Sequence, residues 1–262
     1  MLLKEKIIQY FGEDLFSSRL TILDLGCGFR FPSPSLFAAE GHKAIGVDSL
    51  YIVRKPDIRE YLRSLRRNKL VETLRFLQLD LMAKRRLYER SLENLSHLVL
   101  THSNFELVVD DVEQLANFSD NSMDLVVSTN VLEHVFTVNK AVEQIYRVLG
   151  PGGITAHIIH LFSSLSGSHN PEWQNFARYP AWDHLRSGKF SLPYSHLNRL
   201  KTIDYLNAFS NHFSVVHHEY IPYPMSLDYS IDSHILAEIR ASFGPVTLDD
   251  LVNEKLLVLA AK

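Results

Sequence analysis

Short apolar segments rich in β-branched residues alternate with longer stretches of helical periodicity along most of this chain. Such alternation is typical of an α/β fold, in which helices cover a mostly parallel sheet. The segments predicted to be strands are 21–25, 43–47, 105–109, 124–128, 154–160, 213–220 and 255–261. Helices are predicted near 35–40, 138–149 and 199–211. We therefore expect one α/β domain that spans residues 1–262.

Residues 49–104 form a longer segment than a simple crossover between strands requires. Leu and Tyr recur there at three- and four-residue spacing among charged residues, which predicts two helices, roughly 57–68 and 69–93. The segment holds twelve basic residues against six acidic ones, a net of +6, although the whole chain carries −3. It is predicted to be a helical basic insert, which either meets an anionic partner or is only a solvated helix face.

Residues 161–198 are the second long segment, and they mix Gly, Ser, Asn and Pro with several aromatic residues. Long loops of this composition are usually lids or the walls of binding sites, so we expect a lid here. The run 149–153, Leu-Gly-Pro-Gly-Gly, is interpreted as a turn, because its proline cannot extend a helix and its glycines tolerate positive φ.

The single cysteine, Cys27, excludes an intrachain disulfide, a Cys-rich zinc site and a three-cysteine iron–sulfur cluster. Charges at Lys4, Lys6, Glu13 and Asp14 argue against a signal-peptide core at the N-terminus. No apolar run reaches the roughly 18 residues that a membrane-spanning helix needs. We expect a cytoplasmic protein.

The segment 22–28 places an acid, Asp24, near the end of an apolar strand that breaks into Gly26-Cys27-Gly28. Glycine lets the backbone approach a ligand closely, and a carboxylate at that edge can hold a cation or a hydroxyl. The next strand ends in Asp48, about 20 residues further on, where an acid can accept hydrogen bonds from both hydroxyls of a ribose. Together these motifs predict a cofactor that contains a nucleoside.

The spacing inside the glycine loop separates two classes of such cofactor. A nicotinamide fingerprint Gly-x-Gly-x-x-Gly beginning at Gly26 would need glycine at position 31, where this chain has Phe31. An acid two residues before the first glycine instead suits a cofactor that has no pyrophosphate and whose cationic amino-acid end approaches the loop. S-adenosylmethionine is such a molecule.

With these motifs the chain resembles the class I S-adenosylmethionine-dependent methyltransferases of the type 11 kind. The matching segments, in the family's order, are 23–28, 46–48, 109–115, 122–135, 147–153 and 255–261. The resemblance implies a Rossmann-like sheet of seven strands, mostly parallel with an antiparallel last strand, and S-adenosylmethionine as cofactor. The cofactor contacts it implies are Asp24, Gly26, Cys27, Gly28, Asp48, Ser49, Asp111, Val112 and Asn130. Arg30 stands where many family members carry a further glycine, and it could pair with the cofactor carboxylate.

The acceptor of the methyl group is indicated less directly. No Asn-Pro-Pro-Tyr-like turn follows the predicted fourth strand, which argues against methylation of amino groups on bases or glutamine. The region from His157 to Arg199 resembles methyltransferases of sugar and nucleotide-sugar pathways, so a sugar hydroxyl is the leading prediction, with 161–198 as the acceptor-side lid. RNA bound by the basic insert and a non-catalytic scaffold are the alternatives.

Methylation of a hydroxyl needs a base or a metal to remove its proton. His134 and His160 are the candidate catalytic bases, because His134 is predicted to follow the fourth strand and His160 to lie near the carboxyl end of the fifth, at the edge where this fold binds its cofactor. His134 has the alternative role of anchoring the start of a helix. His184 and His196 lie in the aromatic segment and are further candidates, and no metal site is predicted.

Overall fold

The computed structural model describes residues 2–29, 32–82, 84–100, 105–163, 182–187, 196–223 and 231–262. The chain divides into two compact units. The first comprises Met1–Thr129, Gln144–Thr155 and Lys262, and the second comprises Asn130–Glu143 and Ala156–Ala261. We describe each unit by itself. The expected lid at 161–198 lies mostly outside the described residues.

The strands form a seven-stranded sheet in the order β3-β2-β1-β4-β5-β7-β6. Their bounds are β1 Thr21–Leu25, β2 Lys43–Asp48, β3 Phe105–Val109, β4 Met123–Thr129, β5 Leu149–His160, β6 Val215–Pro222 and β7 Asn253–Ala261. β1 pairs in parallel with β2 and β4, and β2 pairs in parallel with β3. β6 and β7 pair antiparallel, which confirms the predicted sheet with its antiparallel last strand.

The central strands are apolar because side chains on both of their faces are buried. In β1, Leu23 and Leu25 have no exposed surface, and the same holds for Leu125, Val126 and Val127 in β4. The parallel register places Asp24 opposite Gly46. The carboxyl ends of β1 and β2 therefore bring the two acids of the sequence motifs to one edge of the sheet.

The described helices are α1 Leu2–Phe11, α2 Pro32–Ala39, α3 Ile58–Arg67, α4 Leu70–Leu81, α5 Lys84–Ser96, α6 Val138–Val148, α7 Asp183–Ser187, α8 Thr202–Ser210, α9 Ser233–Phe243 and α10 Leu248–Val252. Short 3₁₀ helices span Glu13–Ser17 and Leu132–His134. Sequence-encoded caps set several of these bounds; Asp232, for example, accepts the Ile235 amide hydrogen 2.8 Å away and starts α9. None of the helices described here has the length and apolar character needed to cross a bilayer.

The interpretation of 149–153 as a turn was wrong, because these residues begin β5. Their backbone finds partners at the end of the chain: the Gly152 amide donates to the Lys262 carbonyl at 3.1 Å, and the Lys262 amide donates to the Gly153 carbonyl at 2.9 Å. A strand can contain Pro151 and glycines where such pairing satisfies the neighbouring amides. A local pattern could not reveal a partner more than 100 residues away.

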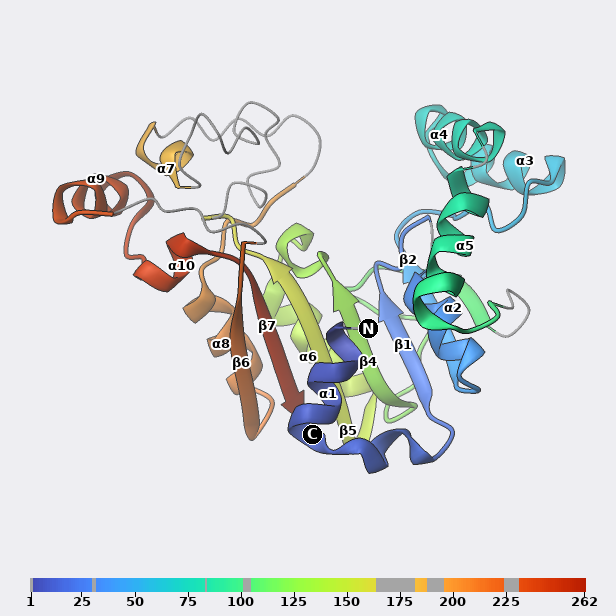
Figure 1. Ribbon diagram of the computed structural model, residues 1–262, viewed down its shortest axis with the longest axis horizontal. Helices are drawn as coiled ribbons and strands as arrows, with labels where there is room; N and C mark the ends of the chain where they lie inside the picture. Colours follow the sequence, from blue (N-terminus) through green and yellow to red (C-terminus); the bar gives the residue numbers. More distant parts are fainter. Residues whose placement is uncertain are drawn as a thin grey trace. The chain divides into compact units, whose positions relative to one another are not determined.

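The long insert contains three helices, α3, α4 and α5, and not the two that were predicted. Leu70, Leu74, Leu77 and Leu81 repeat at helical spacing, but the next positions of that stripe fall in the charged run that begins at Lys84. α4 ends at Leu81, where the amide of Met82 donates back to the Gln78 carbonyl at 3.0 Å. Figure 1 shows α3 and α4 side by side, with α5 running back from α4 toward α2.

Candidate functional site

The loop after β1 turns sharply on two glycines, Gly26 and Gly28, with φ of +60° and +63°. Side chains rarely adopt this left-handed conformation, which is why the sequence needs glycine at both positions. The loop is fastened to β2 by the Cys27 amide, which donates to the Val47 carbonyl at 2.9 Å. Gly46 is also required, because a Cβ there would lie only 2.8 Å from the Cys27 sulfur.

Asp48 ends β2 and holds the glycine loop through its carboxylate. Its Oδ2 accepts the Gly28 amide hydrogen at 3.1 Å, and its Oδ1 accepts that of Leu50 at 2.9 Å. An ionised carboxylate has about four lone-pair positions, so each oxygen keeps the capacity to accept another hydrogen bond. Asp48 can therefore support the loop and still accept hydrogen bonds from a ligand.

A cavity of about 370 Å³ opens beside Gly28 and Asp48. Its other walls come from Leu50, Ile52 and residues of α4, including Phe76. A Cβ added at Gly28 would meet nothing closer than the Gly26 carbonyl oxygen at 4.0 Å, so a ligand can approach the backbone there. The ribose of S-adenosylmethionine fits this arrangement of an open glycine backbone beside a carboxylate.

Asp24 is only 5% exposed, so its carboxyl group is largely removed from water. Burial raises its pKa well above the ordinary range, and the negative charge of Asp48 raises it further, while a hydrogen bond with the Ser33 side chain lowers it. Burial likewise raises the pKa of Asp48, opposed by the amides of Leu50, Gly28 and Ser49. A ligand with a positive charge and donor hydroxyls would relieve both acids.

Cys27 lies between these acids and is buried. Burial raises the pKa of its thiol well above the ordinary range, and the charges of Asp24 and Asp48 raise it further. A thiol held protonated in this way is a poor nucleophile. Cys27 therefore fits the role of a loop residue that packs against Gly46.

The loop after β3 continues the same edge of the sheet, because the Asp110 amide donates to the Asp48 carbonyl at 3.1 Å. Asp111 caps its own turn, with Oδ1 accepting the Glu113 amide hydrogen at 2.9 Å. Asp110 closes the loop by accepting the Asn117 amide and side-chain hydrogens at 2.8 and 3.0 Å. This loop fixes Asp111 and Val112 directly after the strand that pairs with β2.

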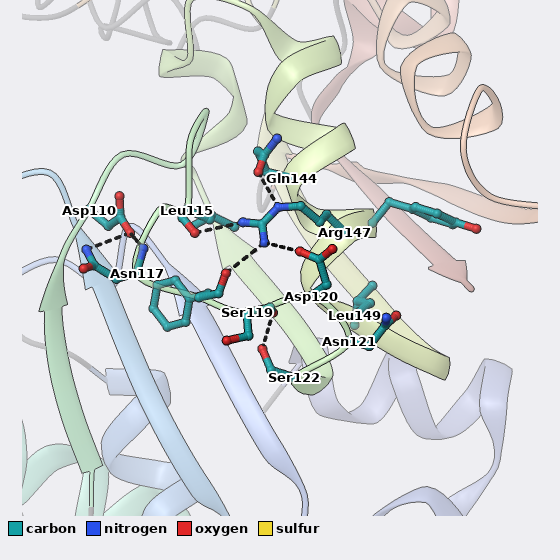
Figure 2. A network of polar contacts seen from close by, with 12 residues as sticks. Asp110, Leu115, Asn117, Ser119, Asp120, Asn121, Ser122, Gln144, Arg147 and Leu149 are labelled. Carbon is teal, nitrogen blue, oxygen red and sulfur yellow. Dashed lines mark hydrogen bonds and ion pairs between the residues drawn. The ribbon is translucent and has the colours of Figure 1, made fainter.

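Arg147 of α6 braces this loop through hydrogen bonds, a role that sequence reasoning missed. Its guanidinium donates to the carbonyls of Leu115 and Phe118 at 2.9 and 2.8 Å, and to Asp120 at 2.7 Å. Its Nε donates to Gln144 at 2.7 Å, as Figure 2 shows. One side chain thus fixes the course of the loop that carries Asp110 and Asp111.

In the second unit, Asn130 begins the turn 130–135 with φ of +57°, and its amide donates to the Ile158 carbonyl at 2.8 Å. Asparagine tolerates this left-handed conformation better than most residues. Asn198 holds the same turn by donating from Nδ2 to the Leu132 carbonyl at 2.7 Å, and it accepts the Tyr205 hydroxyl hydrogen at 2.9 Å. The Leu-Asn-Arg sequence at 197–199 therefore braces this turn.

His134 lies in this turn, with its Nδ1 2.8 Å from the His196 carbonyl oxygen. A carbonyl only accepts, so Nδ1 must carry the hydrogen, and the neutral ring then has its lone pair on Nε2. This arrangement fixes the tautomer of His134 that can act as a base. The His196 ring stacks on Phe136 at a centroid distance of 4.1 Å.

His160 ends β5 between two glutamates. Its Nδ1 lies 3.9 Å from Glu133, and its Nε2 lies 3.9 Å from Glu254. Glu133 is 3% exposed, and burial raises its pKa to about 8, opposed by the backbone amides of Glu133 and His160 and the charge of Lys255. His160 and Glu133 thus form a buried polar cluster at the carboxyl end of β5.

Two further histidines, His184 and His157, are buried in the protein interior. His184 is buried, with its Nε2 2.9 Å from the Phe162 carbonyl oxygen. Burial lowers the pKa of His157 to about 3, so this residue is a neutral core histidine. Within the described ranges, no three residues of the His, Cys, Asp and Glu types are placed to hold a metal ion.

The structure divides the residues of the candidate site between the two units. The first unit brings together Asp24, Gly26, Cys27, Gly28, Asp48, Ser49, Asp111 and Val112. The second contains Asn130, His134 and His160. Arg30 lies outside the described residues.

Comparison with known proteins points to one family. Residues 60–157 match the family described as Methyltransferase domain. The thiol S-methyltransferase TMT1B of Rattus norvegicus is 30% identical over 177 residues, which are 66% of this chain and 54% of that protein. This chain therefore spans about half the length of that relative.

Solved structures share the fold at low sequence identity. An S-adenosylmethionine-dependent methyltransferase from Archaeoglobus fulgidus is 16% identical, covers 100% of this chain and 93% of its own, and has a TM-score of 0.51. The [4+2]-cyclase SpnF is 15% identical, covers 100% of this chain and 80% of its own, and has a TM-score of 0.50. Because a methyltransferase and a cyclase share this fold, the fold alone does not define the reaction.

Proposed function

Because this chain belongs to the class I S-adenosylmethionine-dependent methyltransferases, we propose that it transfers a methyl group from this cofactor to a small-molecule acceptor. The observation that carries the proposal is the pairing of Asp48 with the open backbone of Gly28 at a cavity of about 370 Å³. When bound, S-adenosylmethionine would supply an electrophilic methyl group, because its sulfonium sulfur is a good leaving group.

We assign the parts of the cofactor to residues as follows. Asp48 would accept hydrogen bonds from the ribose hydroxyls, and Gly26 and Gly28 would let the cofactor lie against the backbone. Asp24 would face the cationic amino-acid end, whose charge would oppose the rise in pKa that burial and the charge of Asp48 cause. Asp111 and Val112 would lie against the adenine, while Ser49 and Asn130 complete the proposed contacts.

We propose a thiol as the first acceptor to test. The matched relative is named for a thiol acceptor, and this supports the same chemistry here. A free thiol has a pKa of about 8.5, so a useful fraction ionises near neutral pH without a strong general base. The proton of the thiol would leave to solvent, and the thiolate sulfur would bond to the methyl carbon while the bond from that carbon to the sulfonium sulfur breaks, with S-adenosylhomocysteine as the leaving group.

A sugar hydroxyl is the second candidate, supported by the geometry of His134. Its Nδ1–H donates to the His196 carbonyl, so Nε2 has the lone pair that removal of a hydroxyl proton requires. This candidate would make His134 a catalytic residue, whereas a thiol acceptor would not need it.

Transfer of label from methyl-labelled S-adenosylmethionine separates these possibilities. Matched pairs of acceptors that differ only in S–H or O–H, and a sugar panel, would be assayed with the wild-type chain and with His134→Ala. A thiol acceptor predicts methylation of the thiol member alone, with little effect of His134→Ala. A hydroxyl acceptor predicts methylation of the alcohol and loss of activity in His134→Ala. Cofactor binding without methylation of any acceptor would favour the scaffold.

A further inference from the structure

The helical insert, residues 58–96, exposes an unusual amount of apolar surface. In α3, the exposed side chains Ile58, Leu62 and Leu65 are 70, 48 and 45% accessible. They recur at spacings of four and three residues, so they form one stripe along the helix. Isolated exposed apolar residues are ordinary, but a continuous stripe indicates a surface that contacts something else.

α4 carries a second stripe of the same kind. Leu70, Leu74, Leu77 and Leu81 are between 37 and 77% exposed and follow spacings of four, three and four residues. The side of α4 about a quarter turn from this stripe faces inward, where Thr73 and Phe76 are buried. The stripe is therefore separate from the side of α4 that lines the cavity beside Asp48.

The two stripes lie on the same side of the insert. α3 and α4 face each other through Ser64 and Thr73, whose hydroxyl oxygens are 2.9 Å apart, and through Tyr61 and Asp80, so the helices run antiparallel. At about 100° per residue, each stripe lies roughly a quarter turn onward from the side that faces the other helix. In antiparallel helices, equal rotations in this sense point to the same side. We call this continuous surface the leucine face.

Basic residues border the leucine face. Arg59 and Arg66 lie on the outer flank of α3, next to its apolar stripe. The insert as a whole contains ten basic and five acidic residues. An apolar helix face bordered by arginines on a polar helix is typical of segments that lie in the headgroup region of a membrane.

We propose that the leucine face binds the surface of a membrane that contains anionic phospholipid. The leucines would enter the boundary between headgroups and acyl chains, and the arginines would contact lipid phosphates. A symmetric contact between two copies of this chain would bring two sets of arginines together, and RNA would leave the leucines without a partner. The proposal concerns binding alone and is independent of the acceptor.

Co-sedimentation of the full chain with vesicles tests this proposal. We expect binding to phosphatidylcholine vesicles that contain phosphatidylserine, and weaker binding to phosphatidylcholine alone. Leu62→Ser with Leu74→Ser should lower the partition coefficient at least about tenfold, because two inserted side chains are lost. Arg59→Glu with Arg66→Glu should also lower it about tenfold, and binding by the wild type should weaken above about 0.1 M salt.

Matched controls use exposed residues of the second unit and the first. Ile203→Ser with Leu248→Ser removes side chains that are 57 and 51% exposed, and Arg19→Glu with Lys140→Glu makes the same charge change elsewhere. Both controls should bind vesicles as the wild type does, and thermal unfolding would verify that every variant is folded. The proposal would be overturned if the wild type bound neither kind of vesicle, or if Leu62→Ser with Leu74→Ser bound vesicles as well as the wild type does. So would a wild-type dimer in solution that the leucine variant converts to a monomer, because the face would then join two copies.

Discussion

Replacing Asp48 by Ala should weaken S-adenosylmethionine binding while leaving the chain folded. The carboxylate holds Gly28 and Leu50 with one hydrogen bond to each oxygen, and its remaining lone pairs are assigned to the two ribose hydroxyls. A hydrogen bond to a charged group contributes about 1.5–3 kcal/mol. Because Asp48 is partly desolvated without ligand, we expect a net loss near one such bond, which is a tenfold to hundredfold rise in Kd.

Isothermal titration calorimetry of wild type and Asp48→Ala measures this change. Glu106→Gln is the matched control, because it removes one negative charge from an exposed position on the neighbouring strand β3. Thermal unfolding without ligand shows whether the loop has survived the loss of its two amide acceptors. An unchanged Kd in a folded Asp48→Ala protein would mean that the carboxylate only supports the loop. An equal effect of Glu106→Gln would mean that net charge, and not contact, governs binding.

Two further predictions concern stability. Arg147→Met should lower the free energy of unfolding by about 2–4 kcal/mol, because the carbonyls of Leu115 and Phe118 lose their hydrogen-bond donor. The matching fall in Tm is roughly 5–10 °C, and a fall of less than about 2 °C would contradict this bracing role. Glu133 has a pKa of about 8 in the folded chain and an ordinary pKa of 4.5, so the unfolded chain releases its proton first as pH rises. The free energy of unfolding of the wild type should therefore fall between pH 4.5 and 8, by at most about 1.4 kcal/mol per pH unit. Glu133→Gln should remove the contribution of Glu133 to this pH dependence. Parallel Tm profiles of the two proteins from pH 5 to 8.5 would refute the prediction.

The parts of the fold that could be predicted are those fixed by neighbours in the sequence. β1 and β4 are buried on both faces, so their apolar runs are continuous and bounded by turn residues. The glycine loop was predictable for a similar reason, because positive φ at Gly26 and Gly28 is a local requirement. The position of Asp48 beside the glycine loop was predictable because neighbouring parallel strands, here β1 and β2, end at the same edge of the sheet.

The parts that could not be predicted depend on partners far along the chain. Arg147 reaches carbonyls 29 and 32 residues away, and nothing in its own segment indicates a brace. Asn198 donates to a carbonyl 66 residues away, so its segment was interpreted as part of an acceptor site. The end of α4 was missed because leucines recur at helical spacing on both sides of it, although the positions that would continue the stripe of α4 fall in a charged run.

The contact between Gly46 and Cys27 couples two motifs that are usually considered separately. A Cβ at position 46 would lie 2.8 Å from the Cys27 sulfur, 3.1 Å from the Cys27 Cβ and 3.0 Å from Leu107 Cδ2. Shortening Cys27 to alanine would still leave its Cβ 3.1 Å away, so a larger residue at 46 would press on the glycine loop and on Leu107 of β3 together. Positions 27, 46 and 107 therefore share one small volume, and we expect them to vary as a set among relatives, with no single step that enlarges position 46.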